Sequence, residues 1–251
     1  MNLISKYLAI GLLSAASVVG LAACGGDNGS GGGTAPSAMS NADLLKAAVS
    51  NMKAAKSYTL DVTGVAAGTP ITMSGPIDVV NKNSSISLQS GGQSIVMTTI
   101  LSDTFTSIDG GKTFTKSPAT AGGFDSFTAM WTKTKPDDVD KSKDALKDGT
   151  PATETIDGAA TKHMTADAAA LTALNPNSSS APTAGASSSS GATPTVEGVT
   201  GTYDIWVSTD ANPTVRQMRL VGKSGGQDSS FTIKWSKINE AVDIKAPPTT
   251  P

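Results

Sequence analysis

The stretch Ser57-Tyr58-Thr59-Leu60-Asp61-Val62-Thr63 decides the fold class of this chain. Its apolar and polar side chains alternate, which is the period of a β-strand with one buried face. The same period returns in the segments that follow, at residues 71–79, 86–88 and 95–101. Turn sequences such as Asn81-Lys82-Asn83-Ser84 separate these segments. Short sequential strands joined by tight turns predict an antiparallel sheet.

Two Asp-Gly turns predict hairpins further along the chain. Asp109-Gly110-Gly111 joins a segment with Phe105 and Ile108 to one with Phe114, and Asp157-Gly158 joins residues 153–156 to residues 161–165. Three more alternating segments follow near the C-terminus, at residues 203–207, 215–220 and 231–235. The pattern therefore predicts about eleven strands.

Helical periodicity is confined to a few segments. Ser40 can cap a helix, with Asp43 three residues later as in a capping box, and apolar residues at helical spacing predict an amphipathic helix over residues 41–56. Residues 124–131 predict a short apolar helix, and residues 136–147 predict a polar one. Asp167 can cap a further helix over residues 168–174.

The first residues predict a signal peptide. Lys6 gives a positive flank, and residues 8–21 form a run of small and apolar side chains, shorter than the roughly 20 residues that a membrane-spanning helix needs. The run ends in Leu21-Ala22-Ala23-Cys24, which resembles the lipid-attachment box of bacterial lipoprotein signals. The resemblance implies that residues 1–23 are removed and that the sulfur of Cys24 carries a diacylglyceryl group.

Cys24 is the only cysteine, so the chain offers it no disulfide partner. Lipidation accounts for a lone thiol in an exported protein better than the alternative, an ordinary secretory signal with an incidental cysteine. Two or more acyl chains hold a protein stably on a membrane, whereas one chain does not. Residues 24–39 are rich in glycine and predict a flexible tether. We therefore expect the chain on the extracytoplasmic face of the cell membrane, in the cell envelope.

Charge and residue types argue against several classes of function. The formal net charge is -2, with 19 basic and 21 acidic residues, so we expect no nucleic-acid partner. His163 is the only histidine, and we interpret it as an exposed strand residue beside a turn, not as a general base. No Gly-x-Ser-x-Gly elbow presents a nucleophile. We expect that the protein is not an enzyme and has neither a metal site nor a cofactor.

Residues 175–198 are rich in Ser, Pro, Ala and Gly, a composition typical of disorder. The three predicted strands that follow are too few to bury a core alone. We therefore expect residues 40–248 to be one domain, with residues 175–198 as an insertion in it.

Several short stretches carry a family resemblance through their order along the chain. They are the opening helix into residues 57–60, Ile156-Asp157-Gly158 with Lys162-His163-Met164 and the helix after it, Tyr203-Asp204-Ile205-Trp206-Val207, and residues 235–239 with Ala246-Pro247-Pro248. In this the chain resembles the lipid-carrier lipoproteins of actinobacteria, of the LppX and LprG type, and the related LolA-like periplasmic lipoprotein carriers. The resemblance spans most of the mature chain, and the Ser-rich insertion departs from it. It implies an α+β fold in which a curved antiparallel sheet forms a half-barrel around a few helices.

The apolar face of such a sheet either fills its concave side with side chains or leaves a cavity. Methionines suit a site that must fit variable acyl chains, because they are flexible and polarizable. The candidates for lining a lipid cavity are large apolar side chains on the predicted strands, namely Tyr58, Leu60, Val62, Met73, Ile86, Leu88, Ile95, Met97 and Met218.

The resemblance favours the cavity over the filled core. We therefore expect a monomer that binds lipid or lipoprotein acyl chains and carries or presents them in the envelope, with an envelope transporter as a candidate protein partner. Two alternatives stay open. One is an envelope interaction or sensor lipoprotein with a filled core. The weaker one is a hydrolase, for which His163 or a perturbed carboxylate in a compact pocket would be the sign.

Overall fold

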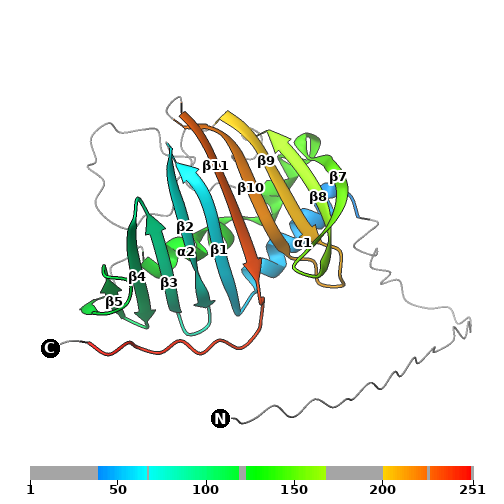
Figure 1. Ribbon diagram of the computed structural model, residues 1–251. Coiled ribbons are helices and arrows are strands. Elements are labelled where there is room, and N and C mark those ends of the chain that lie inside the picture. The colour runs from blue at the N-terminus through cyan, green and yellow to red at the C-terminus, as the bar shows by residue number, and fades with distance from the viewer. Residues whose placement is uncertain (1–38, 67, 119–122, 168–199, 225–226, 250–251) are drawn as a thin grey trace, which may run out of the picture. The chain divides into compact units, whose positions relative to one another are not determined.

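Eleven strands form one open sheet in which every neighbouring pair is antiparallel (Figure 1). The order across the sheet is β6-β5-β4-β3-β2-β1-β11-β10-β9-β8-β7, so β6 and β7 are the two edges. The predicted antiparallel sheet of about eleven strands is confirmed. The strands are β1 Ser57–Ala66, β2 Thr69–Asp78, β3 Asn83–Ser90, β4 Gln93–Ile100, β5 Asp103–Ser107, β6 Thr115–Pro118, β7 Lys147–Ile156, β8 Ala159–Asp167, β9 Thr200–Ser208, β10 Val215–Ser224 and β11 Gln227–Ser236.

The computed structural model describes residues 39–66, 68–118, 123–167, 200–224 and 227–249. All of them belong to the compact unit Thr34–Pro251. The predicted signal peptide, Cys24, the tether up to residue 38, the helix over residues 168–174 and the insertion at residues 175–198 lie outside the described residues.

The first and the last strand pair with each other in the middle of the sheet. Leu60 lies opposite Trp235 and Val62 lies opposite Ile233 in the β1–β11 register. On one side of this pair the chain runs outward from β1 to β6 as a meander, and on the other side it returns from β7 to β11 as a second meander. The β1–β11 pair therefore joins the two meanders into one sheet.

Helix α1, Asn41–Lys53, packs against β9 and β10. Its cap is the predicted one, because Ser40 Oγ accepts a hydrogen bond from the backbone N–H of Asp43. Lys46 Nζ lies 2.8 Å from Asp140 Oδ2 and 3.2 Å from Asp137 Oδ1, which holds the next helical segment beside α1. That segment connects the sheet edges β6 and β7 and contains α2 Gly123–Lys133, α3 Pro136–Asp140 and the 3-10 helix η2 Lys143–Ala145.

One face of the sheet, which we call the inner face, carries Tyr58, Leu60 and Val62 and packs against the helices. Helix α1 contributes its apolar stripe to the same core, namely Leu44, Leu45, Ala48, Val49 and Met52. The polar residues that alternate with the apolar ones in β1, such as Thr59 and Asp61, lie on the opposite face, which we call the outer face. The alternation in β1 therefore corresponds to one buried and one polar face.

Three predicted boundaries are wrong. The helix predicted over residues 41–56 ends at Lys53. The polar helix predicted over residues 136–147 is instead α3 and η2, because Val139 and Leu146 are its only large apolar residues and give a longer helix no apolar stripe. The β5–β6 hairpin exists, but residues 108–114 form its loop, since the Asp109 carboxylate accepts hydrogen bonds from Ser107 Oγ and Thr113 Oγ1 and closes the turn there.

Candidate functional site

The structure brings all nine predicted cavity-lining residues to the inner face. Residues opposite each other in an antiparallel pair point to the same side of the sheet, and so do alternate residues of one strand. Val62 lies opposite Met73, Met73 opposite Leu88, and Leu88 opposite Ile95. The same register places the remaining candidates on this face. Tyr58 and Leu60 alternate with Val62 in β1, and Ile86 in β3 lies opposite Met97 in β4. Met218 in β10 lies opposite Ile233 in β11, which in turn lies opposite Val62.

Burial of these side chains falls from β1 toward β4. Tyr58, Leu60 and Val62 in β1, Met73 in β2, Ile86 in β3 and Met218 in β10 are all buried. Leu88, Ile95 and Met97 are only half-buried, although they share the same face. The inner face therefore has a closely packed part around β1 and a part on β3 and β4 where apolar surface is still accessible.

Helix α2 covers the inner face near β1 and β11. The Tyr58 hydroxyl donates a hydrogen bond to the Phe127 carbonyl oxygen at 3.3 Å. Trp131 meets Trp235 edge to face, with 5.0 Å between the ring centroids. Burial raises the pKa of Tyr58 above its usual value, because the phenolate would lose its solvation. Tyr58 is thus a neutral hydrogen-bond donor that positions α2.

The inner face also holds three buried hydroxyls with no hydrogen-bond partner in the described part of the chain. One belongs to Ser229 in β11, and the other two belong to Ser84 in β3 and Thr99 in β4, which lie directly opposite each other. In the same row Ser84 lies opposite Ile77, whose own opposite neighbour is Tyr58. Most buried polar groups in proteins find a partner, so this pair is an unusual polar spot in an apolar surface.

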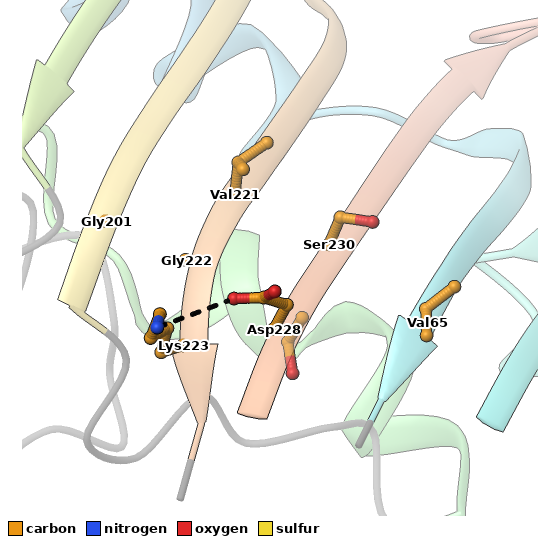
Figure 2. Close-up of a pocket in the computed structure, with 8 residues that line it drawn as sticks. Val65, Gly201, Val221, Gly222, Lys223, Asp228 and Ser230 are labelled. Atoms are coloured by element: carbon orange, nitrogen blue, oxygen red, sulfur yellow. Dashed lines mark ion pairs between the residues drawn. The ribbon is translucent and has the colours of Figure 1, made fainter. Parts of the chain in front are cut away.

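A separate shallow groove of about 580 Å³ lies at the ends of β1, β9, β10 and β11 (Figure 2). Val65, Ser230 and Val221 lie side by side across three strands of its floor. Figure 2 shows the ion pair at its rim, in which Lys223 Nζ lies 3.9 Å from Asp228 Oδ1. None of the nine predicted residues lines this groove, and its Val65-Ser230-Val221 row belongs to the outer face.

His163 is in strand β8 as predicted, but the prediction that it is exposed is wrong. Its side chain is buried, with the residue 6% exposed, and its ring stacks on Trp206 at 4.3 Å between centroids. Nδ1 lies 2.9 Å from the Pro151 carbonyl oxygen and Nε2 lies 3.2 Å from Asp204 Oδ1. The register between β7 and β8 shifts between Asp148 and Thr153, and this irregular segment covers the ring on the outer face. The ring is therefore enclosed between Trp206 and the β7 segment.

Two further observations concern metals and membranes. Among the residues that the structure describes, no group of three or more His, Cys, Asp or Glu side chains is placed to hold a metal ion. In the same described ranges, no helix combines the length and the apolar character needed to cross a bilayer.

Several inner-face residues were left out of the predicted set although they belong to the same strands. They share the face through the same register and include Ile71, Ile77, Leu220, Phe231, Ile233 and Trp235. The alternation of apolar and polar residues that selected Met73 and Met218 extends to these positions. The sequence pattern alone could therefore have predicted them.

Comparison with known proteins assigns no family. No family model matches the chain, and no curated protein matches it. An uncharacterized conserved protein from Thermus thermophilus has a solved structure that is 7% identical at a TM-score of 0.36, covering 79% of this chain and 88% of that one. The structure of PNGF-II is 10% identical at a TM-score of 0.27 and covers 75% of this chain, which spans 29% of PNGF-II. Neither likeness is close enough to carry an argument about fold or function.

Proposed function

We propose that this chain is a membrane-anchored lipoprotein whose inner face binds the acyl chains of a lipid or lipoprotein and carries or presents them in the cell envelope. In this proposal the open sheet is a LolA-like half-barrel of the LppX and LprG type, and a lipid on Cys24 holds it on the extracytoplasmic face of the cell membrane. The protein acts as a monomer, without a cofactor, and an envelope transporter is its candidate protein partner.

The decrease in burial across the inner face carries the proposal. Leu88, Ile95 and Met97 continue the apolar face of β1 and β2, yet they are only half-buried. An apolar surface that a fold leaves accessible beside its core is a typical place for an apolar ligand. Met97 adds a flexible side chain that adapts to acyl chains of different length and branching.

The mechanism needs no covalent chemistry. Each methylene that leaves water for the inner face contributes about 0.8 kcal/mol, so an acyl chain binds through desolvation alone. Headgroups remain in water at the edge of the apolar surface, because burying a polar group without a partner is unfavourable. The enzyme alternative has no support from His163, whose ring is packed between Trp206 and the β7 segment.

Recovery of bound lipid tests the proposal. The full chain would be produced in an actinobacterial host, purified, and extracted with organic solvent for mass spectrometry. We expect lipid from the wild-type chain and from Val96→Asp, and a strong loss with Ile95→Asp. The two residues are neighbours in β4, both are half-buried, and they point to opposite faces of the sheet. Absence of lipid from the wild-type chain, or equal loss in both variants, would contradict the proposal.

The anchor is tested separately by the mass of the N-terminal peptide. We expect Cys24 at the N-terminus of the membrane-bound chain, with a mass increase that corresponds to diacylglycerol and any further acyl group. Cys24→Ser should release the chain from membranes. An unmodified thiol on the exported chain would support the ordinary secretory signal instead.

The groove on the outer face favours a second candidate function, an interaction or sensor lipoprotein with a filled core. Val221 is exposed in that groove beside the Lys223–Asp228 pair, which is a combination suited to a protein contact. A stoichiometric protein partner whose binding is lost with Val221→Asp, together with an inner face that never yields lipid, would favour this candidate.

A further inference from the structure

Two large apolar side chains are exposed on neighbouring turns of the sheet. Val80 follows β2 and is 65% exposed, and Leu101 follows β4 and is 69% exposed. Because β2 and β4 both pair antiparallel with β3, they run in the same direction and both turns lie at the same end of the sheet (Figure 1). The two side chains therefore project from one end of the fold.

Hydrogen bonds hold these turns in place. The Asp78 carboxylate accepts bonds from the backbone N–H and the side-chain amide of Asn81. Asn83 Oδ1 accepts a bond from the backbone N–H of Leu101 at 3.0 Å, which links the first turn to the second. Leu101 has a φ of 53°, a left-handed conformation that bulky residues rarely adopt. Since Leu101 is not buried in the fold, contact with something outside the chain would account for a leucine at this position.

Four lysines lie in or beside the segments that meet at the first of these turns. The Val79 N–H donates to the Lys56 carbonyl oxygen, and Lys82 lies in the same turn as Val80. Lys53 ends α1 close by, and Lys237 precedes Asn239, whose side chain accepts the Lys56 N–H. Within the described residues, none of these four ammonium groups lies within ion-pair distance of a carboxylate.

Two carboxylates at this end of the sheet are paired with lysines, Asp103 with Lys116 and Asp243 with Lys245. Asp78 bonds to the neutral Asn81 and keeps its negative charge. Glu240 is exposed and is the remaining acid on the segment that follows β11. Among the described residues, the four unpaired lysines outnumber the two remaining acids, Asp78 and Glu240, so the local charge is positive around two exposed apolar tips.

We infer that this end of the sheet docks on an anionic bilayer surface, with Val80 and Leu101 inserted among the lipids and Lys53, Lys56, Lys82 and Lys237 at the headgroups. Apolar side chains gain by entering the interface, and lysines gain from the potential of anionic lipids. This contact is independent of what the inner face binds, and it would orient the anchored domain on the membrane.

A local fluorescence probe tests the inference. Leu101→Trp in the full chain places an exposed indole at the tip, whereas the described tryptophans Trp131, Trp206 and Trp235 are all buried. The matched control is Ile108→Trp. Ile108 is 80% exposed and follows β5, which runs opposite to β4, so it lies toward the other end of the sheet. The vesicles contain brominated phosphatidylcholine, either alone or in equal mixture with phosphatidylglycerol.

We expect the indole at position 101 to shift its emission to shorter wavelength and to be quenched by the brominated lipid, more strongly with phosphatidylglycerol. The indole at position 108 should show neither effect. Because the readout is local, a lipid on Cys24 does not affect the comparison. Equal quenching at both positions, or none at position 101, overturns the inference, and the second outcome leaves the tip as a candidate protein contact.

Two further sets of variants test whether the result depends on one substitution that disturbs folding. Val80→Trp should repeat the quenching seen at position 101. Gln in place of both Lys56 and Lys82 should remove the extra quenching by phosphatidylglycerol, whereas Gln in place of both Lys112 and Lys147 should leave it unchanged. Loss of the anionic-lipid effect in both double variants, or in neither, contradicts a role for this lysine cluster.

Discussion

Leu101 combines a strained backbone with an exposed apolar side chain, so no burial inside the fold offsets the strain. Its left-handed backbone costs roughly 1–2 kcal/mol for a residue with a Cβ atom, and its side chain is 69% exposed. Asparagine adopts this conformation more readily than leucine. A leucine in this position is therefore unfavourable for the isolated domain, and membrane docking offers a reason for it.

Leu101→Asn should stabilise the domain. We expect the free energy of unfolding to rise by up to about 1 kcal/mol, because the substitution relieves the left-handed strain and sacrifices little burial. Urea denaturation measures this change. Leu101→Ala is the control, since alanine keeps the Cβ atom and the strain. An equal gain in both variants would show that the side chain, and not the backbone, is responsible.

The second prediction at the scale of residues concerns alkaline pH. Burial raises the pKa of Tyr58 above its ordinary value of 10.0. Above pH 10 the unfolded chain therefore releases a proton that the folded chain keeps, so stability is fully present below that pH and falls as the pH rises further. The slope approaches about 1.4 kcal/mol per pH unit for one such group.

Tyr58→Phe should reduce this alkaline slope while lowering stability at neutral pH by about 1 kcal/mol, because it removes the hydrogen bond to Phe127. Denaturation curves between pH 8 and pH 12 measure both effects. Burial also raises the pKa of Tyr203, so Tyr203→Phe should remove a further part of the slope. An unchanged slope in the Tyr58 variant would contradict the assignment.

At the scale of elements, the irregular part of β7 depends on a close contact with His163. A Cβ atom added to Gly149 would lie 2.4 Å from Cγ of the His163 ring, closer than any real contact. Gly149→Ala should therefore force the segment off the ring. We expect a loss of about 1–3 kcal/mol in the free energy of unfolding, the usual range for overpacking.

A double-mutant cycle provides the control for this prediction. In a His163→Ala background the ring is absent, so Gly149→Ala should cost much less than it does in the wild-type chain. Thermal unfolding of the four chains measures the coupling. Equal cost in both backgrounds would mean that Gly149 is required for its backbone and not for its closeness to the ring.

The elements show which features local sequence could predict. Alternation identified the strands and the inner face correctly, because a period of two is a local property that tertiary contacts reinforce. The helix over residues 136–147 was wrong, since its polar residues offered no buried stripe to decide its length. The burial of His163 could not be predicted from its own strand, because the atoms that cover it come from the irregular segment of β7.

At the scale of the domain, the arrangement of strands was less predictable than their number. The pairing of β1 with β11 joins residues that are far apart in the chain, and no local pattern specifies it. The same limit applies to the candidate site. The side chains that share the inner face followed from periodicity, but how far the helices cover them depends on where the α2 segment lies, which sequence alone did not indicate.

The β1–β11 pair predicts that the two meanders do not fold separately. A chain that ends before Gln227 lacks β11, so β1 and β10 lose their shared neighbour and each becomes an edge strand. We expect such a chain to lose protection of β1 amides in hydrogen exchange and to lose cooperative unfolding. A chain that ends after Glu240 keeps β11 and the Asn239 bonds to Lys56 and Ser57, and it should retain both.

The position of β11 also has a consequence in time. Strand β11 is the last strand of the sheet along the chain, so it is also the last to become available for pairing. Until residues 227–236 are present, β1 has one side unpaired and open to other strands. The last strand to be synthesised is the one that completes the centre of the sheet, so the chain has to be kept from premature pairing until its final residues are delivered.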